Sequence, residues 1–593
     1  MRAAAVQPDA TTDRNTPRPP PPPARRGTRS ADTVALAALG LLLALPLRGH
    51  FAKPHGDFFE LRECGVALLR GELPPTLKRG PVYPLLVAGG GALCRAAGVS
   101  DPPPEQYFAG WLGVVLLPLN AVLLHRLAGR WCAALAPRGA AGARWWAAAF
   151  LLLPVGLYCT AHLLLEPLLV TLLLATLLAA GVQHPRAAYA LAALATLTRF
   201  DVAGLIPGLA LADLRAGRPA RRVLLLSAAA LLPLTAWLGL TAATWSTHAD
   251  EHYLRQMARR PTCDPVGAVA VVLDAAFNPP RLRLPLWLAL DEAHLRAVCR
   301  GLLALGALGG LAALLRRREH SATVAAVAAA AYLAVHAIFP FRFLRFGYPP
   351  AAVLLPAAAA GLAGGWHALG RRPATRAVRN GAGVLLTLGG LLVALGEYDA
   401  VAVPPADAGW TRAALLGVAL ATIVLALARL ANRPTRLAHA AVALGVVLLA
   451  RVQLREADAL LNGGYDTRPL VAAARWIAAH TGPDDGVVSD QPGLLRLYAP
   501  NAPRRRFLSY ADVQADDWSG VVAELRARGV RYLLWHEHVA EEVAHELDAR
   551  PWRLDRFAPL ASPEACPDVE IVWRSTPGPL TWVLRLRPAP WAD

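Results

Sequence analysis

The stretch HLLLEPLLVTLLLATLLAAGV, residues 162–182, contains one acid and otherwise reads as an almost unbroken apolar helix. About 20 apolar helical residues are enough to cross the hydrocarbon core of a bilayer. Similar runs recur along a chain of 593 residues, of which 55% are hydrophobic and only 17% are charged. Because lipid requires backbone groups to be hydrogen-bonded within the helix, this repetition predicts a polytopic α-helical membrane protein rather than a soluble protein with buried helices.

The apolar runs predict about 11 full spans, or 13 transmembrane helices if both halves of a broken hairpin are counted. The hairpin covers residues 186–213, where basic flanks on both sides and the central Arg199 and Asp201 are incompatible with a single span. Its turn is expected at residues 198–201, packed inside protein. The full spans are expected at residues 32–49, 107–128, 144–160, 162–182, 222–244, 299–315, 321–339, 346–367, 380–396, 411–430 and 435–452.

The formal charge of +18 does not indicate a nucleic-acid partner, because the arginines fall in short clusters between apolar runs. That distribution follows the positive-inside rule for a multi-pass protein of the cell membrane. The basic loops place the N-terminus in the cytoplasm, and an odd number of full spans then places the C-terminus outside.

The chain divides into three parts by composition. Residues 1–31 are a Pro-rich cytoplasmic tail that we expect to be disordered. Residues 32–455 form the transmembrane domain, with a first external loop at 50–106. Residues 456–593 mix amphipathic helices with short alternating strands, which predicts a small extracytoplasmic α/β domain.

The first external loop contains the strongest candidates for chemistry. Asp57 is followed one helical turn later by Glu60, so both carboxylates can share a face. A carboxylate among apolar neighbours can serve as a general base, although a solvated acidic surface is the alternative reading. Arg79 could meet a phosphate or simply lie among lipid headgroups, and Tyr83 opens a short apolar helix expected to lie at the membrane interface.

Two further groups are expected at the same external face. His162 and Glu166 are one turn apart at the start of the fourth predicted span, where the acid either serves function or complements the helix dipole. Arg342 and Arg345 lie in FPFRFLRFGYPP (339–350), on the side where basic residues are disfavoured. A lipid phosphate would explain them, as would ordinary headgroup contact.

The sequence offers little support for a metal centre. The seven cysteines are scattered singly, without the spacing of a metal site. His536 and His538 could share a strand face, but no third ligand is evident. We therefore assign no metal ligands.

The order and sidedness of these motifs resemble GT-C membrane glycosyltransferases, in the branch of protein O-mannosyltransferases and aminoarabinose transferases. The resemblance covers most of the chain. It rests on Asp57, GVALLRG (65–71), PVYP (81–84), Glu166-Pro167, Thr198-Arg199, Arg342 and Arg345 before Tyr-Pro-Pro, and AARWI (473–477).

The resemblance implies transfer of a sugar from a polyprenyl-phosphate donor to a lipid, glycan or protein acceptor at the external face. It implies that Asp57, or Glu60 as a second candidate, orients or deprotonates the acceptor hydroxyl. Many relatives have two adjacent acids where this chain has Gly56-Asp57-Phe58, which weakens the case for a divalent metal there. A divalent metal therefore stays possible but weakly supported, and no cofactor is assigned. The substrate-binding candidates are Arg79, Tyr83, His162, Glu166, Arg199, Asp201, Arg342 and Arg345.

Two other classes of protein remain open. A transporter or lipid-sugar flippase would favour inverted repeats, and the sequence shows none. A non-catalytic cell-envelope assembly protein would leave Asp57 and Glu166 without a shared site.

Overall fold

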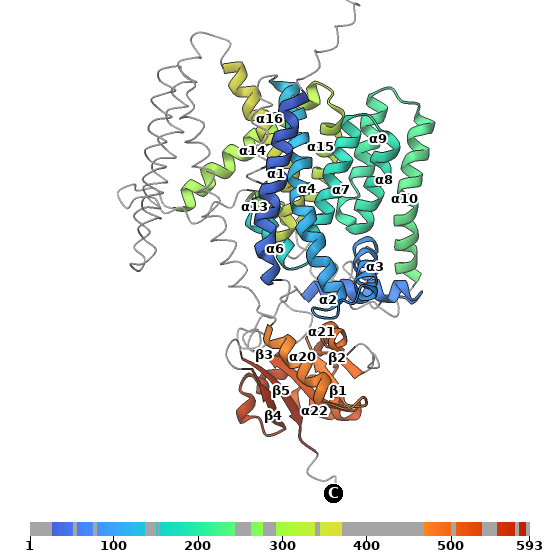
Figure 1. Ribbon diagram of the computed structural model, residues 1–593, viewed down its shortest axis with the longest axis vertical. Coiled ribbons are helices and arrows are strands. Elements are labelled where there is room, and N and C mark those ends of the chain that lie inside the picture. Colours follow the sequence, from blue (N-terminus) through green and yellow to red (C-terminus); the bar gives the residue numbers. More distant parts are fainter. Residues whose placement is uncertain are drawn as a thin grey trace, which may run out of the picture.

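The computed structural model has two parts, a helical bundle and a small domain with a β-sheet that lies against one end of the bundle (Figure 1). The structure describes residues 26–50, 56–74, 80–136, 147, 150–151, 153–243, 263–276, 292–338, 344–369, 468–490, 492–499, 506–536, 554–575 and 580–588.

The bundle is made of long apolar helices together with shorter helical segments. Its elements are α1 (Arg26–Ala44), η1 (Leu45–His50), α2 (Gly56–Leu69), α3 (Val82–Ala96), α4 (Pro104–Leu135), α6 (Pro154–Ala161), α7 (Glu166–Gly181), α8 (Pro185–Thr198), η3 (Phe200–Val202), α9 (Leu205–Arg215), α10 (Ala220–Ala243), α13 (Pro265–Ala276), α14 (Glu292–Arg316), α15 (His320–Ile338), η5 (Leu344–Gly347) and α16 (Tyr348–Leu369).

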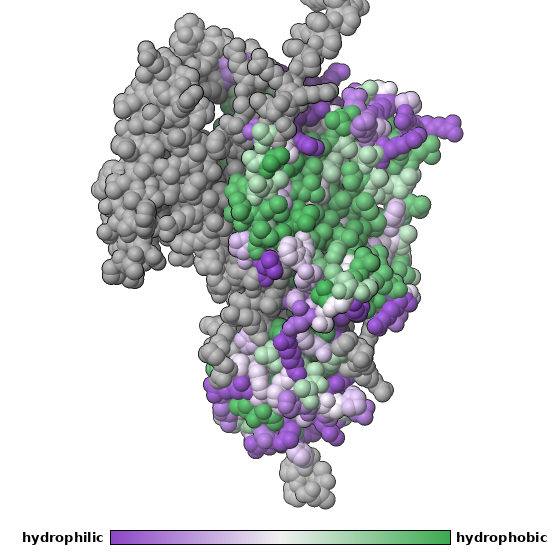
Figure 2. All heavy atoms as spheres, in the orientation of Figure 1, coloured by the Kyte–Doolittle hydropathy of each residue, from purple (hydrophilic) through white to green (hydrophobic). Residues whose placement is uncertain are grey.

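Five helices in the described part of the chain are long and apolar enough to cross a membrane, or six if the bent pair α6–α7 counts as one span. Their outer surface forms an apolar belt between two hydrophilic ends (Figure 2). The predicted class, a polytopic α-helical membrane protein, is confirmed. The total of 11 to 13 spans stays a prediction, because the expected spans at 380–396, 411–430 and 435–452 lie outside the described residues.

The chain around residue 162 differs from the sequence-based expectation. The eight-residue α6 ends at Ala161, His162 is its C-terminal cap, and Leu163 has a positive φ of 59°. The next helix, α7, begins only at Glu166, and its axis is bent by 120° from that of α6. Because Pro167 favours a helix start, it sets the beginning of α7 here. The expectation that His162 and Glu166 lie one turn apart on the same helix is therefore wrong.

The broken hairpin is present where the sequence predicts it. Helix α8 ends at Thr198, and Arg199 has an extended backbone before α9 follows. Arg218, just past α9, donates a hydrogen bond to the carbonyl oxygen of Gln183, just before α8, at 3.4 Å. The two open ends of the hairpin therefore lie on the same side of the bundle.

The C-terminal part is a small α/β domain, as predicted. Its five-stranded sheet has the order β2-β1-β3-β5-β4, with β1 parallel to both neighbours and β5 antiparallel to β3 and β4. The elements are α20 (Arg468–His480), β1 (Gly486–Ser489), α21 (Pro492–Tyr498), β2 (Phe507–Ser509), η7 (Tyr510–Asp512), α22 (Trp518–Ala527), β3 (Val530–His536), η8 (Leu554–Ala561), η9 (Pro563–Ala565), β4 (Val569–Arg574) and β5 (Thr581–Leu586).

Helices α2 and α3 occupy the junction between the bundle and this domain (Figure 1). They pack closely because Gly65 of α2 meets the backbone of α3: a Cβ at Gly65 would lie 2.0 Å from the carbonyl oxygen of Pro84. On its other side α2 contacts α21 of the C-terminal domain. The part of the first loop that forms α2 and α3 is therefore a structured layer between the two parts.

Candidate functional site

An ion pair joins the first loop to the middle of the chain. Asp57 lies in the first turn of α2, and its Oδ2 is 2.7 Å from Nη2 of Arg345 in η5. Both side chains are largely withdrawn from solvent, with 19% and 10% of their surfaces exposed. Water therefore screens this pair little.

A second charged group is centred on Arg199, at the break of the α8–α9 hairpin. Its Nη1 lies 3.2 Å from Oε1 of Glu166, at the start of α7, and its Nη2 binds Asp201. His336 of α15 completes the group, with Nε2 at 3.0 Å from Oδ2 of Asp201. Three helical elements, α7, η3 and α15, and the extended Arg199 thus place ionisable side chains together. Such a group is the usual mark of function in a membrane bundle.

Phe346 connects the two groups. The guanidinium carbon of Arg199 lies 4.8 Å from the centroid of its ring, and that of Arg345 lies 5.3 Å from it. Its backbone oxygen also accepts a hydrogen bond from Tyr332. Both arginines are therefore held against one aromatic ring, which favours a fixed position for each cation.

The site combines three carboxylates, two guanidinium groups and one imidazole. Oε2 of Glu166 and Oδ1 of Asp201 are buried and have no hydrogen-bond partner among the described residues. The arginines offer donors in the fork geometry that suits a phosphate, while Asp57 offers an acceptor for a hydroxyl proton. The arrangement can hold an anion next to a carboxylate base.

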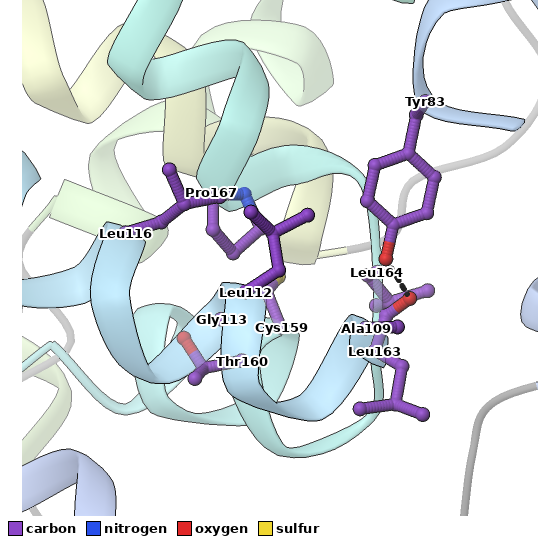
Figure 3. Close-up of a pocket in the computed structure, with 10 residues that line it drawn as sticks. All are labelled: Tyr83, Ala109, Leu112, Gly113, Leu116, Cys159, Thr160, Leu163, Leu164 and Pro167. Carbon is purple, nitrogen blue, oxygen red and sulfur yellow. Dashed lines mark hydrogen bonds between the residues drawn. The ribbon is translucent and has the colours of Figure 1, made fainter. Parts of the chain in front are cut away.

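Tyr83 and His162 lie beside this charged site. The hydroxyl of Tyr83 donates to the carbonyl oxygen of Leu163 at 2.7 Å, which ties α3 to the turn between α6 and α7 (Figure 3). The ring of His162 packs on Tyr158, with centroids 4.4 Å apart. Both residues are therefore held at or near the turn that precedes Glu166.

Figure 3 shows residues that line a crevice, Tyr83 among them. The crevice contains about 190 Å³ of space between atoms, part of it open to solvent, and no part of it is wide enough to hold a water molecule. Its lining residues come from α3, α4, α6, the turn after α6 and α7; most are apolar, and Thr160, Cys159 and Tyr83 add polar groups. As it stands, the crevice is a seam between helices rather than an open binding cavity.

The structure thus brings together most of the site residues proposed from the sequence. Asp57, Glu166, Arg199, Asp201 and Arg345 form the charged network, with Tyr83 and His162 next to it. Glu60 is half-buried one turn after Asp57 on the same helix. Arg79 and Arg342 lie outside the described residues.

Sequence reasoning missed His336 and Phe346. His336 lies within a predicted span, so the rule that singled out Glu166 could have identified it as well. Phe346 carried no such signal, because an aromatic residue in an aromatic-rich loop is common. Sequence reasoning also did not predict the ion pair between Glu63 and Arg496 of α21.

The described residues contain no group of three His, Cys, Asp or Glu side chains placed to hold a metal ion. In the C-terminal domain, Nε2 of His536 lies 2.9 Å from Oδ2 of Asp490. Glu537 and His538 lie outside the described part of the chain.

No protein-family model and no curated protein sequence matches this chain. A solved structure does: ArnT from Cupriavidus metallidurans bound to undecaprenyl phosphate, with a TM-score of 0.53 over 95% of this chain and 98% of that one. The chain has the ArnT fold. The apo state of the same ArnT matches with a TM-score of 0.50 over 94% of this chain and 98% of its own.

The identity to ArnT is 16%, so the likeness establishes the fold and leaves the activity to be argued from the site. The fold implied by the resemblance to GT-C aminoarabinose transferases is confirmed. The match to ArnT spans the bundle and the C-terminal domain together, because it covers nearly the whole of both chains.

Proposed function

We propose that this integral membrane protein is a glycosyltransferase of the GT-C type, which moves a sugar from a polyprenyl-phosphate donor to an acceptor hydroxyl at the external membrane face. The observation that carries the proposal is the Asp57–Arg345 pair, which places a carboxylate against a guanidinium beside the Arg199 network. The ArnT structure with undecaprenyl phosphate supports the class of donor.

We infer the orientation from the positive-inside rule, and the basic residues at the other end of the bundle support it. Arg130 pairs with Glu319 at 2.7 Å, and Arg215 donates to the carbonyl oxygen of Leu315, so the basic loops meet there. By the positive-inside rule that end faces the cytoplasm. The charged site and the domain of residues 456–593 then lie outside, as do the acceptors.

The reaction needs a base and a stabiliser of the leaving group. The acceptor oxygen attacks the anomeric carbon, and the bond from that carbon to the phosphate oxygen breaks. Its electron pair remains on the polyprenyl phosphate, and the hydroxyl proton passes to the carboxylate of Asp57. Arg345, with Arg342 as a further candidate, offsets the negative charge on the departing phosphate.

The Asp57–Arg345 pair also suggests an order of binding. While Arg345 holds Asp57, that carboxylate is a poor proton acceptor. A donor phosphate brings its own charged oxygens to the guanidinium and competes with Asp57 for it. We therefore expect the donor to bind first and thereby make Asp57 available to the acceptor.

Arg199 is proposed to supply a fixed positive charge rather than a movable one. Glu166 and Asp201 hold it from two sides, and Phe346 lies against its face. A charge that is already oriented needs no reorganisation when negative charge develops on the donor. Tyr83 and His162 are proposed to shape the apolar wall beside the donor, and Arg79 to contact its phosphate.

The test is to incubate membranes containing the protein with labelled polyprenyl-phosphate sugars and to identify the labelled product. Transfer of label to an acceptor, lost in Asp57→Asn, is the expected result. Movement of intact donor across proteoliposomes without a transferred product would favour a flippase. Neither transfer nor movement would favour an assembly role.

A further inference from the structure

An ion pair between mostly buried side chains joins the C-terminal domain to α2. Nη1 of Arg496, in α21, lies 2.7 Å from Oε2 of Glu63 in α2. The exposed fractions of the two side chains are 23% and 11%. Arg496 is also fixed to the sheet, since its Nη2 donates to the carbonyl oxygen of Phe507 in β2 at 3.0 Å.

Backbone packing reinforces this contact. Phe59 and Glu63 are four residues apart and so share one face of α2. That face meets the start of α21, where a Cβ on Gly493 would lie 2.9 Å from Cβ of Phe59. Only a glycine lets the two helices approach this closely.

The same helix carries Asp57. Asp57 and Glu63 are six residues apart, which is about 9 Å along an α-helix. Within the bundle α2 is held by Arg345 at its first turn and by close packing on α3 at Gly65. Because α2 is short and is held at both of these points, a displacement of the helix at Glu63 also moves the carboxylate of Asp57.

We propose that Arg496 is a positioning residue, through which the C-terminal domain holds α2 and sets the place of Asp57. This rests on the proposed function, in which Asp57 is the base. The domain then contributes to the rate of transfer without touching the reacting atoms. Misplacement of a catalytic group by about 1 Å can cost about 100-fold in rate.

The test compares Arg496→Met, Arg496→Lys and the near-isosteric Glu63→Gln in the full-length protein. We expect kcat to fall about 10- to 100-fold in Arg496→Met and Glu63→Gln, with the donor KM within about twofold. Arg496→Lys should recover part of the loss. The double variant Arg496→Met/Glu63→Gln should be no worse than either single one, because both remove the same contact.

The chain offers a matched control in a second ion pair between the same two parts. Arg475 of α20 lies 3.1 Å from Asp101, but these side chains are 56% and 74% exposed. Exposed pairs contribute little. Arg475→Ala should therefore leave kcat unchanged, and an equal loss in Arg475→Ala would overturn a specific role for Arg496.

Hydrogen exchange separates this inference from the proposed function. Arg496→Met should lose protection at the amides of α2, while β1 and β3 stay protected. If α2 loses protection but the wild-type protein transfers no sugar, the function fails and the coupling stands. If Arg496→Met transfers sugar as the wild type does and its α2 amides keep their protection, the proposed coupling is wrong. If Arg496→Met does not fold, the same two measurements on Glu63→Gln test the contact, because that variant removes the other partner of the ion pair.

Discussion

The carboxylate of Asp57 and the guanidinium of Arg345 lie 2.7 Å apart, although one belongs to the first loop and the other to the turn before α16. Each of the two side chains therefore neutralises the charge of the other and helps to hold it in place. Replacing either residue should affect a different step of the proposed reaction, so the two can be separated by experiment.

Asp57→Asn should reduce transfer by at least about 100-fold, which is the usual contribution of a general base. The amide keeps the shape of the side chain but cannot take up the proton. Turnover with a labelled donor is the measurement, and the Kd for donor should stay the same or fall, because the carboxylate no longer competes with the phosphate for Arg345. Turnover close to that of wild type in purified Asp57→Asn would remove Asp57 from the role of base.

Arg345→Gln should weaken donor binding by about tenfold or more, because a charge-assisted hydrogen bond to phosphate is worth about 1.5–3 kcal/mol. The measurement is the Kd for a polyprenyl phosphate without sugar, which isolates the phosphate contact. Increasing salt should weaken wild-type binding less than that of a surface site, since Arg345 is largely buried. An unchanged Kd in Arg345→Gln would show that the phosphate binds elsewhere.

Arg199→Met should lower stability by about 3–5 kcal/mol, because Glu166 and Asp201 would be left as buried carboxylates without their cation. The readout is the melting temperature in detergent. Adding Glu166→Gln should recover part of the loss, since one uncompensated charge is then removed. If Arg199→Met melts like the wild type, the network does not bear on stability.

Gly65→Ala should destabilise the junction of α2 and α3 by about 1–3 kcal/mol, as expected for overpacking. Its Cβ would meet the backbone oxygen of Pro84, which cannot move aside as a side chain could. Gly89→Ala, in α3, is the matched control, because nothing lies within 4 Å of a Cβ there. That control should be neutral or stabilising by up to about 1 kcal/mol.

The sequence predicted the features that depend on the energetic cost of placing a charge within an apolar segment. A charge inside an apolar run is expensive, so Glu166, Arg199 and Asp201 could be identified without any structure. The hairpin break at Arg199 followed from the same cost together with the basic flanks. The α/β character of the C-terminal part followed from its change in periodicity.

What escaped the sequence was pairing over long separations. Arg345 pairs with Asp57 and not with a lipid because of the way α2, η5 and α6 pack. No local sequence pattern encodes this packing. The turn at Leu163 was also missed, because residues 162–182 read equally well as one helix. A positive φ at a leucine is a tertiary outcome that propensity does not predict.

The hairpin at Arg199 has a consequence for how the chain enters the membrane during synthesis. Arg199 and Asp201 are two residues apart in sequence and bind each other, so they can enter as a neutral pair. Glu166 precedes them and is already in place, whereas His336 is made more than a hundred residues later. We therefore expect α7, α8 and α9 to insert as one unit, which α15 completes when it arrives.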